Sequence, residues 1–190
     1  MYLRARGYCW RALERTHPGV RAAISADPQK GLAAMGAMDV PVLYWIAASW
    51  GGELGLAANQ LLRLPDLVVI RSILARALAL NDSWDGGTLH EAMIGLDGMS
   101  PLLGGSATRA RQHFDKAVTL ADGKSAYAYV ALAESVSVAA QDRAEFEKLL
   151  KTALAIDLEA RPSLRLANLV AQRRARALLA RGDTLFPRRR

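Results

Sequence analysis

The sequence predicts an all-α fold, and three observations support that prediction. Alanine, leucine and arginine dominate the chain, whereas β-branched residues are sparse and scattered. Apolar residues recur with a helical period in successive segments, and Gly, Pro, Asn or Asp separates one segment from the next. The ends of three segments also resemble one another, which indicates a repeated unit of helices.

Turn and capping residues mark where each helix begins and ends. The expected helices span residues 1–15, 40–58, 66–80, 88–95, 107–120, 125–140, 143–156 and 164–180, with two short Ala-rich turns before the second. Asp39 and Ser106 stand at expected N-caps, where a side-chain oxygen can accept from a free backbone N–H. Pro65 and Pro162 open their helices, because a first-turn residue needs no N–H donor. Residues 59–64 are expected to form a connector.

The expected helix 40–58 is apolar apart from Ser49 and Glu53, so we expect it to be buried on most of its surface. One of its faces carries, in order, Tyr44, Ala48, Gly51 and Gly55. That face narrows from a ring to bare backbone, which predicts that a second helix approaches it closely. The segment is long enough to cross a membrane, but a charged Glu53 at bilayer depth is costly, so a buried soluble helix is favoured.

Similar motifs recur at the ends of three expected helices. They are RALALND at 76–82, KAVTLAD at 116–122 and TALAID at 152–157, and their alanines Ala77, Ala117 and Ala153 are 40 and 36 residues apart. A period of roughly 34 residues built from two helices is typical of tetratricopeptide repeats. We therefore predict a right-handed, tetratricopeptide-like helical solenoid with degenerate repeats, closed by a C-terminal capping helix over 164–180.

The length of 190 residues and the 52% hydrophobic content predict a single helical-repeat domain over 1–186, followed by a basic tail at 187–190. Residues 161–190 hold nine arginines and a single acid, Asp183, a net charge of +8. Because the whole chain carries +7, the remaining residues carry −1. The basic end could bind nucleic acid, but the last helix has no aromatic residue to stack on a base, so a solvated helix is favoured.

The sequence contains no pattern of catalytic or metal-binding residues. His90–Glu91 lacks the second histidine of a zinc-protease helix, and one cysteine with three scattered histidines argues against a metal site. No serine stands in a nucleophile elbow. We therefore expect neither enzymatic activity nor a cofactor.

The first helix of each repeat pair lines the concave face of such a solenoid, which is its usual binding surface. The candidate ligand-binding residues concentrate on those helices and are Tyr44, Trp45, Ser49, Trp50, Trp84, His90 and Asn168. The rings would supply apolar contact, while the serine, histidine and asparagine would orient a polar group of the ligand. The alternative interpretation is that the tryptophans of 40–58 only fill the core.

Five segments, taken in order, resemble a known family. They are LYWIAASWG at 43–51, LNDSWDGGTLHEAMIG at 80–95, PLLGGSATRARQHFDKAVTL at 101–120, FEKLLKTALAID at 146–157 and RPSLRLANLVAQRRARALL at 161–179. This set is similar to the T components associated with tripartite ATP-independent periplasmic (TRAP) transporters. The resemblance covers nearly the whole chain, from about Tyr2 to Phe186. No single segment is diagnostic, whereas the ordered set is fairly specific.

The resemblance implies a periplasmic, all-helical accessory protein of a TRAP-type uptake system. Family members are thought to form homotrimers with a tunnel in each protomer, to bind the extracytoplasmic solute-binding subunit, and to handle hydrophobic small ligands. Many carry a lipid anchor, whereas this sequence shows neither an export signal nor a lipid-attachment cysteine, so membrane attachment would need an anchor absent from it. The alternatives are a generic peptide-binding repeat scaffold and, less favoured, a basic nucleic-acid-binding protein.

Overall fold

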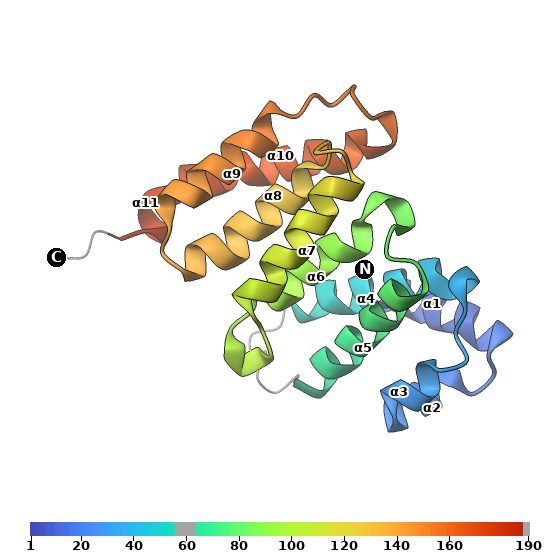
Figure 1. Ribbon diagram of the computed structural model, residues 1–190. Helices are drawn as coiled ribbons and strands as arrows, with labels where there is room; N and C mark the ends of the chain where they lie inside the picture. The colour runs from blue at the N-terminus through green and yellow to red at the C-terminus, as the bar shows by residue number, and fades with distance from the viewer. Residues whose placement is uncertain (56–63, 188–190) are drawn as a thin grey trace. The chain divides into compact units, whose positions relative to one another are not determined.

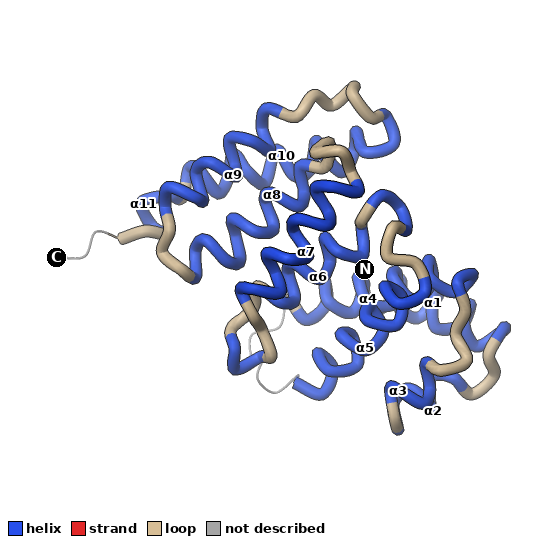
Figure 2. Tube along the Cα trace, in the orientation of Figure 1, coloured by secondary structure: helices blue, strands red, loops and turns tan. Residues whose placement is uncertain are grey.

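The computed structural model describes residues 1–55 and 64–187, and every regular element in them is helical (Figures 1 and 2). The α-helices are α1 (Tyr2–Thr16), α2 (Val20–Ala26), α3 (Pro28–Leu32), α4 (Val40–Leu54), α5 (Leu64–Leu80), α6 (Thr88–Asp97), α7 (Ala107–Leu120), α8 (Ala126–Leu132), α9 (Arg143–Ala155), α10 (Arg165–Ala180) and α11 (Gly182–Leu185). The predicted all-α class is confirmed. The right-handed repeat solenoid stays a prediction.

The chain divides into two compact units, Met1–Trp84 and Asp85–Arg190. The first unit holds α1 to α5, and the second holds α6 to α11. The single repeat domain over 1–186 therefore stays a prediction, and each unit is described below by itself.

Three of the sequence predictions fall wholly or partly on residues that the structure does not describe, among them the end of the helix 40–58. The expected connector 59–64 lies outside the described residues apart from Leu64, which begins α5. The basic tail 187–190 lies outside them apart from Pro187.

Most helix boundaries agree with the predicted ones to within two residues. The helix α7 spans the predicted 107–120, and Pro65 lies in the first turn of α5 as expected. The helix α4 is described to Leu54, and residues 56–58 of the predicted helix 40–58 lie outside the described residues. The predicted helix 125–140 forms α8 and then a π-helical turn, Ala133–Ser137.

In the first unit, α4 packs against both α1 and α5. Leu43 and Ile46 of α4 and Ile70 and Ile73 of α5 are buried almost completely. Burying one such side chain stabilises the fold by about 1.5–3 kcal/mol. The buried apolar side chains of α4 therefore lie mainly on the side of the helix that packs against α1 and α5.

The acid in this apolar helix, Glu53, is compensated by a basic residue. Its carboxylate pairs with Arg6 of α1 at 2.9 Å. The guanidinium of Arg6 also lies over the ring of Trp50, 4.7 Å from the ring centroid. Trp50 meets Trp10 of α1 edge-on, with 6.4 Å between centroids. An ion pair and ring contacts therefore fasten α1 to α4.

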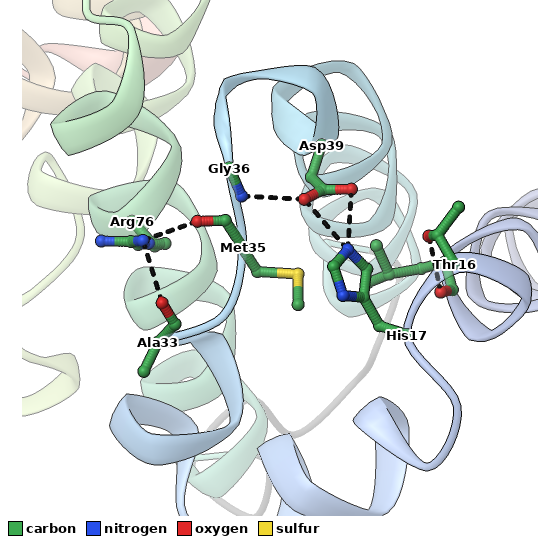
Figure 3. A network of polar contacts seen from close by, with 8 residues as sticks. Thr16, His17, Ala33, Met35, Gly36, Asp39 and Arg76 are labelled. Carbon is green, nitrogen blue, oxygen red and sulfur yellow. Dashed lines mark hydrogen bonds and ion pairs between the residues drawn. The ribbon is translucent and has the colours of Figure 1, made fainter.

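A polar network, drawn in Figure 3, closes the turn that leads into α4. The carboxylate of Asp39, in the 3₁₀ turn η1 (Ala37–Asp39), accepts from the Gly36 N–H at 2.8 Å. His17 Nε2, just after α1, lies 3.1 Å from both oxygens of Asp39. Asp39 is the N-cap residue of α4, as predicted, but its carboxylate bonds to Gly36 and His17 and not to the first turn of that helix.

Arg76 of α5 holds the loop that follows α3, on the other side of the same network (Figure 3). Its Nη2 donates to the carbonyl oxygens of Ala33, at 3.1 Å, and Met35, at 2.6 Å. Carbonyl groups just beyond a helix lack intrahelical donors. The guanidinium supplies those donors and so fixes the loop against α5.

In the second unit, α8, α9 and α10 pack together around one apolar cluster. Phe146 and Leu150 of α9 are fully buried in it, and the Phe146 ring lies 5.0 Å from that of Phe186. The helices α6 and α7 pack against each other. Ser106 caps α7 as predicted, since its Oγ accepts from the Arg109 N–H at 3.3 Å.

The glycines of α4 do not play the role that their spacing predicts. A Cβ built on Gly51 would meet no described atom within 4 Å, and one built on Gly55 would meet only carbonyl oxygens of its own helix. The predicted close helix contact at these two positions is therefore wrong. The close contact lies at Gly52, where a Cβ would stand 2.5 Å from the Tyr2 ring of α1. Because a helix turns about 100° per residue, the next position faces a different neighbour.

A close approach of backbone to backbone occurs at Gly31 of α3. A Cβ there would lie 2.5 Å from the backbone nitrogen of Ile24 in α2. Backbone atoms cannot swing aside as the end of a side chain can, so only glycine fits between these two helices.

We predict that Gly31→Ala lowers the free energy of unfolding by roughly 1–3 kcal/mol, because the added methyl overpacks the contact between α2 and α3. Gly51→Ala is the matched control, since it adds a methyl to a helix where the space is open. That variant should gain about 0.5–1 kcal/mol from the lower helix cost of alanine. Urea unfolding followed by circular dichroism measures both, and equal midpoints would contradict this assignment.

Candidate functional site

The candidate site is an aromatic cluster, defined as Tyr44, Trp45 and Trp84, in the unit Met1–Trp84. Tyr44 and Trp45 are neighbours on α4, and Trp84 follows α5 after a short turn. The centroid of the Tyr44 ring lies 5.1 Å from those of both tryptophans, at interplanar angles of 69° to Trp45 and 49° to Trp84. Such edge-on and tilted arrangements are favourable for aromatic rings. The structure therefore brings together three of the predicted ligand-binding residues.

The aromatic cluster is covered only in part. Trp45 is 57% exposed, whereas Tyr44 and Trp84 have intermediate exposure. Leu43 and Ile46 point into the core of the unit. Successive residues of a helix are rotated by about 100°. Because Leu43 and Ile46 face the core, Trp45 lies on the outer side of α4. The cluster thus presents the exposed Trp45 ring on a helix whose opposite side is buried.

The other two predicted residues of α4 serve the fold around them. The hydroxyl of Ser49 donates to the carbonyl oxygen of Trp45 and approaches that of Ile46 at 3.4 Å, within its own helix. Trp50 packs on Trp10 and Arg6, at the contact between α1 and α4. The Ser49 side chain therefore reaches only the backbone of Trp45, and the described ring contact of Trp50 is with Trp10 rather than with the aromatic cluster.

His90 lies in the second unit, on α6, and is buried. Its Nδ1 stands 2.8 Å from Nδ1 of His113 on α7. A hydrogen bond between two such nitrogens needs one proton, so one ring donates and the other accepts. On its other side, His113 Nε2 lies 3.7 Å from Asp97, and Asp97 in turn accepts from Arg109 at 2.9 Å. His90 is therefore the first member of a polar chain that links α6 to α7.

The electrostatics of this polar chain favour neutral imidazole at its centre. Burial lowers the pKa of His113, the carboxylate of Asp97 opposes this shift, and the guanidinium of Arg109 adds to it. The net shift is downward, so His113 is mostly neutral at pH 7. A neutral ring has one bare nitrogen, as the contact with His90 requires.

Asn168 of α10 is fully buried, and its amide is engaged by backbone groups. Its Oδ1 accepts from the Ala126 N–H at 2.9 Å, and its Nδ2 donates to the Lys124 carbonyl oxygen at 2.9 Å. It thereby takes over the capping of α8, whose N-cap residue Ser125 donates its hydroxyl to Glu91 instead.

The carboxyl group of Glu91, on α6, has a strongly raised pKa. The pKa of this carboxyl is raised to about 7: burial raises it, the bond from the Ser125 hydroxyl lowers it in part, and the negative charge of Asp85 adds to the rise. Glu91 is therefore a polar group whose ionisation costs free energy at neutral pH.

Sequence reasoning missed the partners of the predicted residues, namely Trp10 beside Trp50 and both His113 and Asp97 near His90. One signal was present for the histidine pair, since two successive helices joined by a turn each carry a single histidine. Which sides of those helices face each other depends on their packing, and spacing alone does not give it.

Comparison with known proteins identifies the family of this chain. The family model described as TRAP transporter T-component matches residues 1–186. The chain belongs to the TRAP transporter T-component family. A protein from Treponema pallidum (strain Nichols), described only as uncharacterized, is 29% identical to this T-component over 192 residues. The alignment covers 98% of this chain, and the chain spans 59% of the length of that relative.

Membership confirms the resemblance deduced from the five ordered segments. Within residues 1–55 and 64–187, none of the helices combines the length and apolar character that crossing a bilayer requires. Among the same residues, no three His, Cys, Asp or Glu side chains are grouped as they would be around a metal ion.

We predict that the contribution of Glu91 to the stability of this T-component falls as pH rises from about 4.5 to 7, because the unfolded chain releases the Glu91 proton first. A shift from the ordinary pKa of 4.5 to about 7 corresponds to roughly 3 kcal/mol at pH 8. Glu91→Gln removes this cost, so the variant should be more stable than the parent at pH 8 and should lose that advantage near pH 4.5.

The matched control is Glu145→Gln in the same unit. The bond from Arg111 lowers the pKa of Glu145, against the effect of burial, and a bond from Ser137 lowers it too. This variant should therefore lose stability at pH 8. Thermal unfolding at both pH values tests the pair, and a pH-independent difference between parent and Glu91→Gln would contradict the assignment.

Proposed function

We propose that this T-component is a periplasmic accessory subunit of a TRAP-type solute uptake system. It binds the solute-binding subunit of that system and holds a hydrophobic small ligand against the aromatic cluster. The observation that carries the proposal is Trp45, a large ring that is 57% exposed and already seated against Tyr44, which also contacts Trp84. Family membership supplies the transport setting.

Covering this ring would be favourable. An aromatic side chain buries about 150–250 Å² when it is enclosed. Enclosing the exposed part of Trp45 would therefore remove on the order of 100 Å² from water, which is worth roughly 2–3 kcal/mol. Tyr44 and Trp84 hold the ring in place before the ligand arrives, so little conformational entropy is lost on binding.

The remaining predicted residues have supporting roles in this proposal. Trp50 and Ser49 keep α4 in position through α1 and through the helix backbone. His90 and Asn168 order α6, α7 and α8 of the second unit. On this view the aromatic cluster supplies apolar contact, and no residue of the chain performs catalysis.

Assembly and partner binding complete the proposal. We infer a homotrimer in which each protomer offers an inner tunnel, as the family resemblance implies. The solute-binding subunit would dock through shape and apolar contact, and the charges at the arginine-rich end would act chiefly on the association rate.

We predict that Trp45→Ala weakens binding of N-phenyl-1-naphthylamine, an apolar fluorescent probe, by roughly 5- to 30-fold, the equivalent of about 1–2 kcal/mol of lost ring contact. The melting temperature should change little, because the ring is mainly exposed. Tyr8→Ala is the control, since that ring is 58% exposed but lies outside the aromatic cluster. Equal losses in the two variants, or a large melting-temperature drop with unchanged binding in Trp45→Ala, would refute the cluster as the ligand site.

We predict that the cognate solute-binding subunit associates with this T-component with a Kd in the micromolar range, measured by surface plasmon resonance on both folded proteins. Trp45→Ala should leave that affinity nearly unchanged if the ring contacts ligand rather than protein. No binding at tens of micromolar, with both proteins in their native oligomeric states, would remove the transport role and favour a generic peptide-binding scaffold.

A further inference from the structure

The outer side of α1 carries a stripe of positive charge. The residues of this basic stripe follow one another at helical spacing and are Arg4, Tyr8, Arg11 and Arg15. All of them are exposed, and Tyr8 is 58% exposed. The opposite side of α1 holds the buried Trp10 and Leu13, so the stripe points away from the core of its unit. It is therefore a surface that the packing of the unit does not use.

The charge of the basic stripe is not neutralised within the described part of the chain. The acid of α1, Glu14, is engaged elsewhere, because its carboxylate accepts from the backbone N–H groups of Gly19 and Arg21, both at 2.8 Å. The remaining arginine of α1, Arg6, is paired with Glu53. The described residues offer no ion pair to the three arginines of the stripe.

Aromatic and aliphatic groups lie among these charges. The guanidinium of Arg11 stacks over the Tyr8 ring, 4.5 Å from its centroid, which fixes both side chains on the surface. Leu3, which precedes Arg4 at the start of α1, is 62% exposed. Arginines interleaved with tyrosine and an aliphatic side chain are typical of helices that lie in a membrane interface.

The dimensions of the surface distinguish between two classes of anionic partner. A helix of 15 residues is about 22 Å long and about 10 Å wide, so its outer ridge offers roughly 220 Å². A stable protein interface needs about 800 Å² on each partner. An anionic bilayer has no such requirement, because each arginine near its surface contributes separately through the surface potential.

We propose that the basic stripe of α1 rests on an anionic phospholipid surface. The guanidinium groups of Arg4, Arg11 and Arg15 donate to lipid phosphate oxygens, and Tyr8 and Leu3 reach the boundary between headgroups and acyl chains. The contact is peripheral and needs no membrane-spanning segment. It is also independent of the proposed ligand and partner, so either conclusion can fail alone.

The strength of the contact follows from the number of arginines. Each one changes binding to an anionic surface about five-fold, the equivalent of about 1 kcal/mol. Three together therefore give roughly a hundred-fold preference for anionic over neutral membranes, and salt weakens it because the charges are exposed.

Co-sedimentation of the whole chain with sucrose-loaded vesicles tests this proposal. Vesicles of phosphatidylcholine alone are compared with vesicles that contain 30% phosphatidylglycerol. We expect binding to the anionic vesicles only, and less of it as salt is raised. Equal binding to both vesicle types, or tighter binding to single-stranded DNA than to the anionic vesicles, would overturn the proposal.

Two triple variants locate the contact on the chain. The variant Arg4→Gln/Arg11→Gln/Arg15→Gln should lower the partition coefficient on anionic vesicles about a hundred-fold. The matched control, Arg173→Gln/Arg176→Gln/Arg181→Gln, removes the same charge from exposed positions on and just after α10 and should stay within about five-fold of the parent. Circular dichroism confirms that both variants fold, and an equal loss in the two would show that net charge rather than the basic stripe drives binding.

Discussion

The contact between α1 and α4 is the interaction on which the first unit depends. The helix α4 is apolar on most of its sides and carries one acid, so it needs neighbours that cover rings and neutralise Glu53 together. Arg6 does both, because its guanidinium pairs with Glu53 and lies over Trp50. With that side of α4 occupied, Trp45 is left on the outside, where Tyr44 and Trp84 complete the aromatic cluster.

In the second unit, several buried polar side chains bond to groups on another helix. Ser125 holds the N-cap position of α8 but gives its hydroxyl to Glu91, and Asn168 of α10 supplies the missing acceptor to α8. Such buried groups are costly unless they are bonded, so each one fixes the register of the helices that it joins. For Glu91, the free-energy cost of burying a charged carboxylate is expressed in its raised pKa.

The two exposed features of the first unit serve different chemistry. The aromatic cluster offers apolar area that is already ordered, which suits a hydrophobic ligand. The basic stripe offers unpaired charge on a narrow ridge, which suits an extended anionic surface. The two features lie on different elements of the unit, since the stripe lies on α1 and the cluster is built on α4 with Trp84.

The sequence by itself determined the helical class, most helix boundaries and the family, because helical period, capping residues and ordered motifs are local properties of the chain. It also predicted that Tyr44, Trp45 and Trp84 belong to one site, although it did not separate them from Ser49, Trp50, His90 and Asn168. Only the tertiary structure decided which side of each helix meets a neighbour. A rotation of about 100° per residue moves the close contact from Gly51 to Gly52, and it places Trp50 in a helix contact while Trp45 stays exposed.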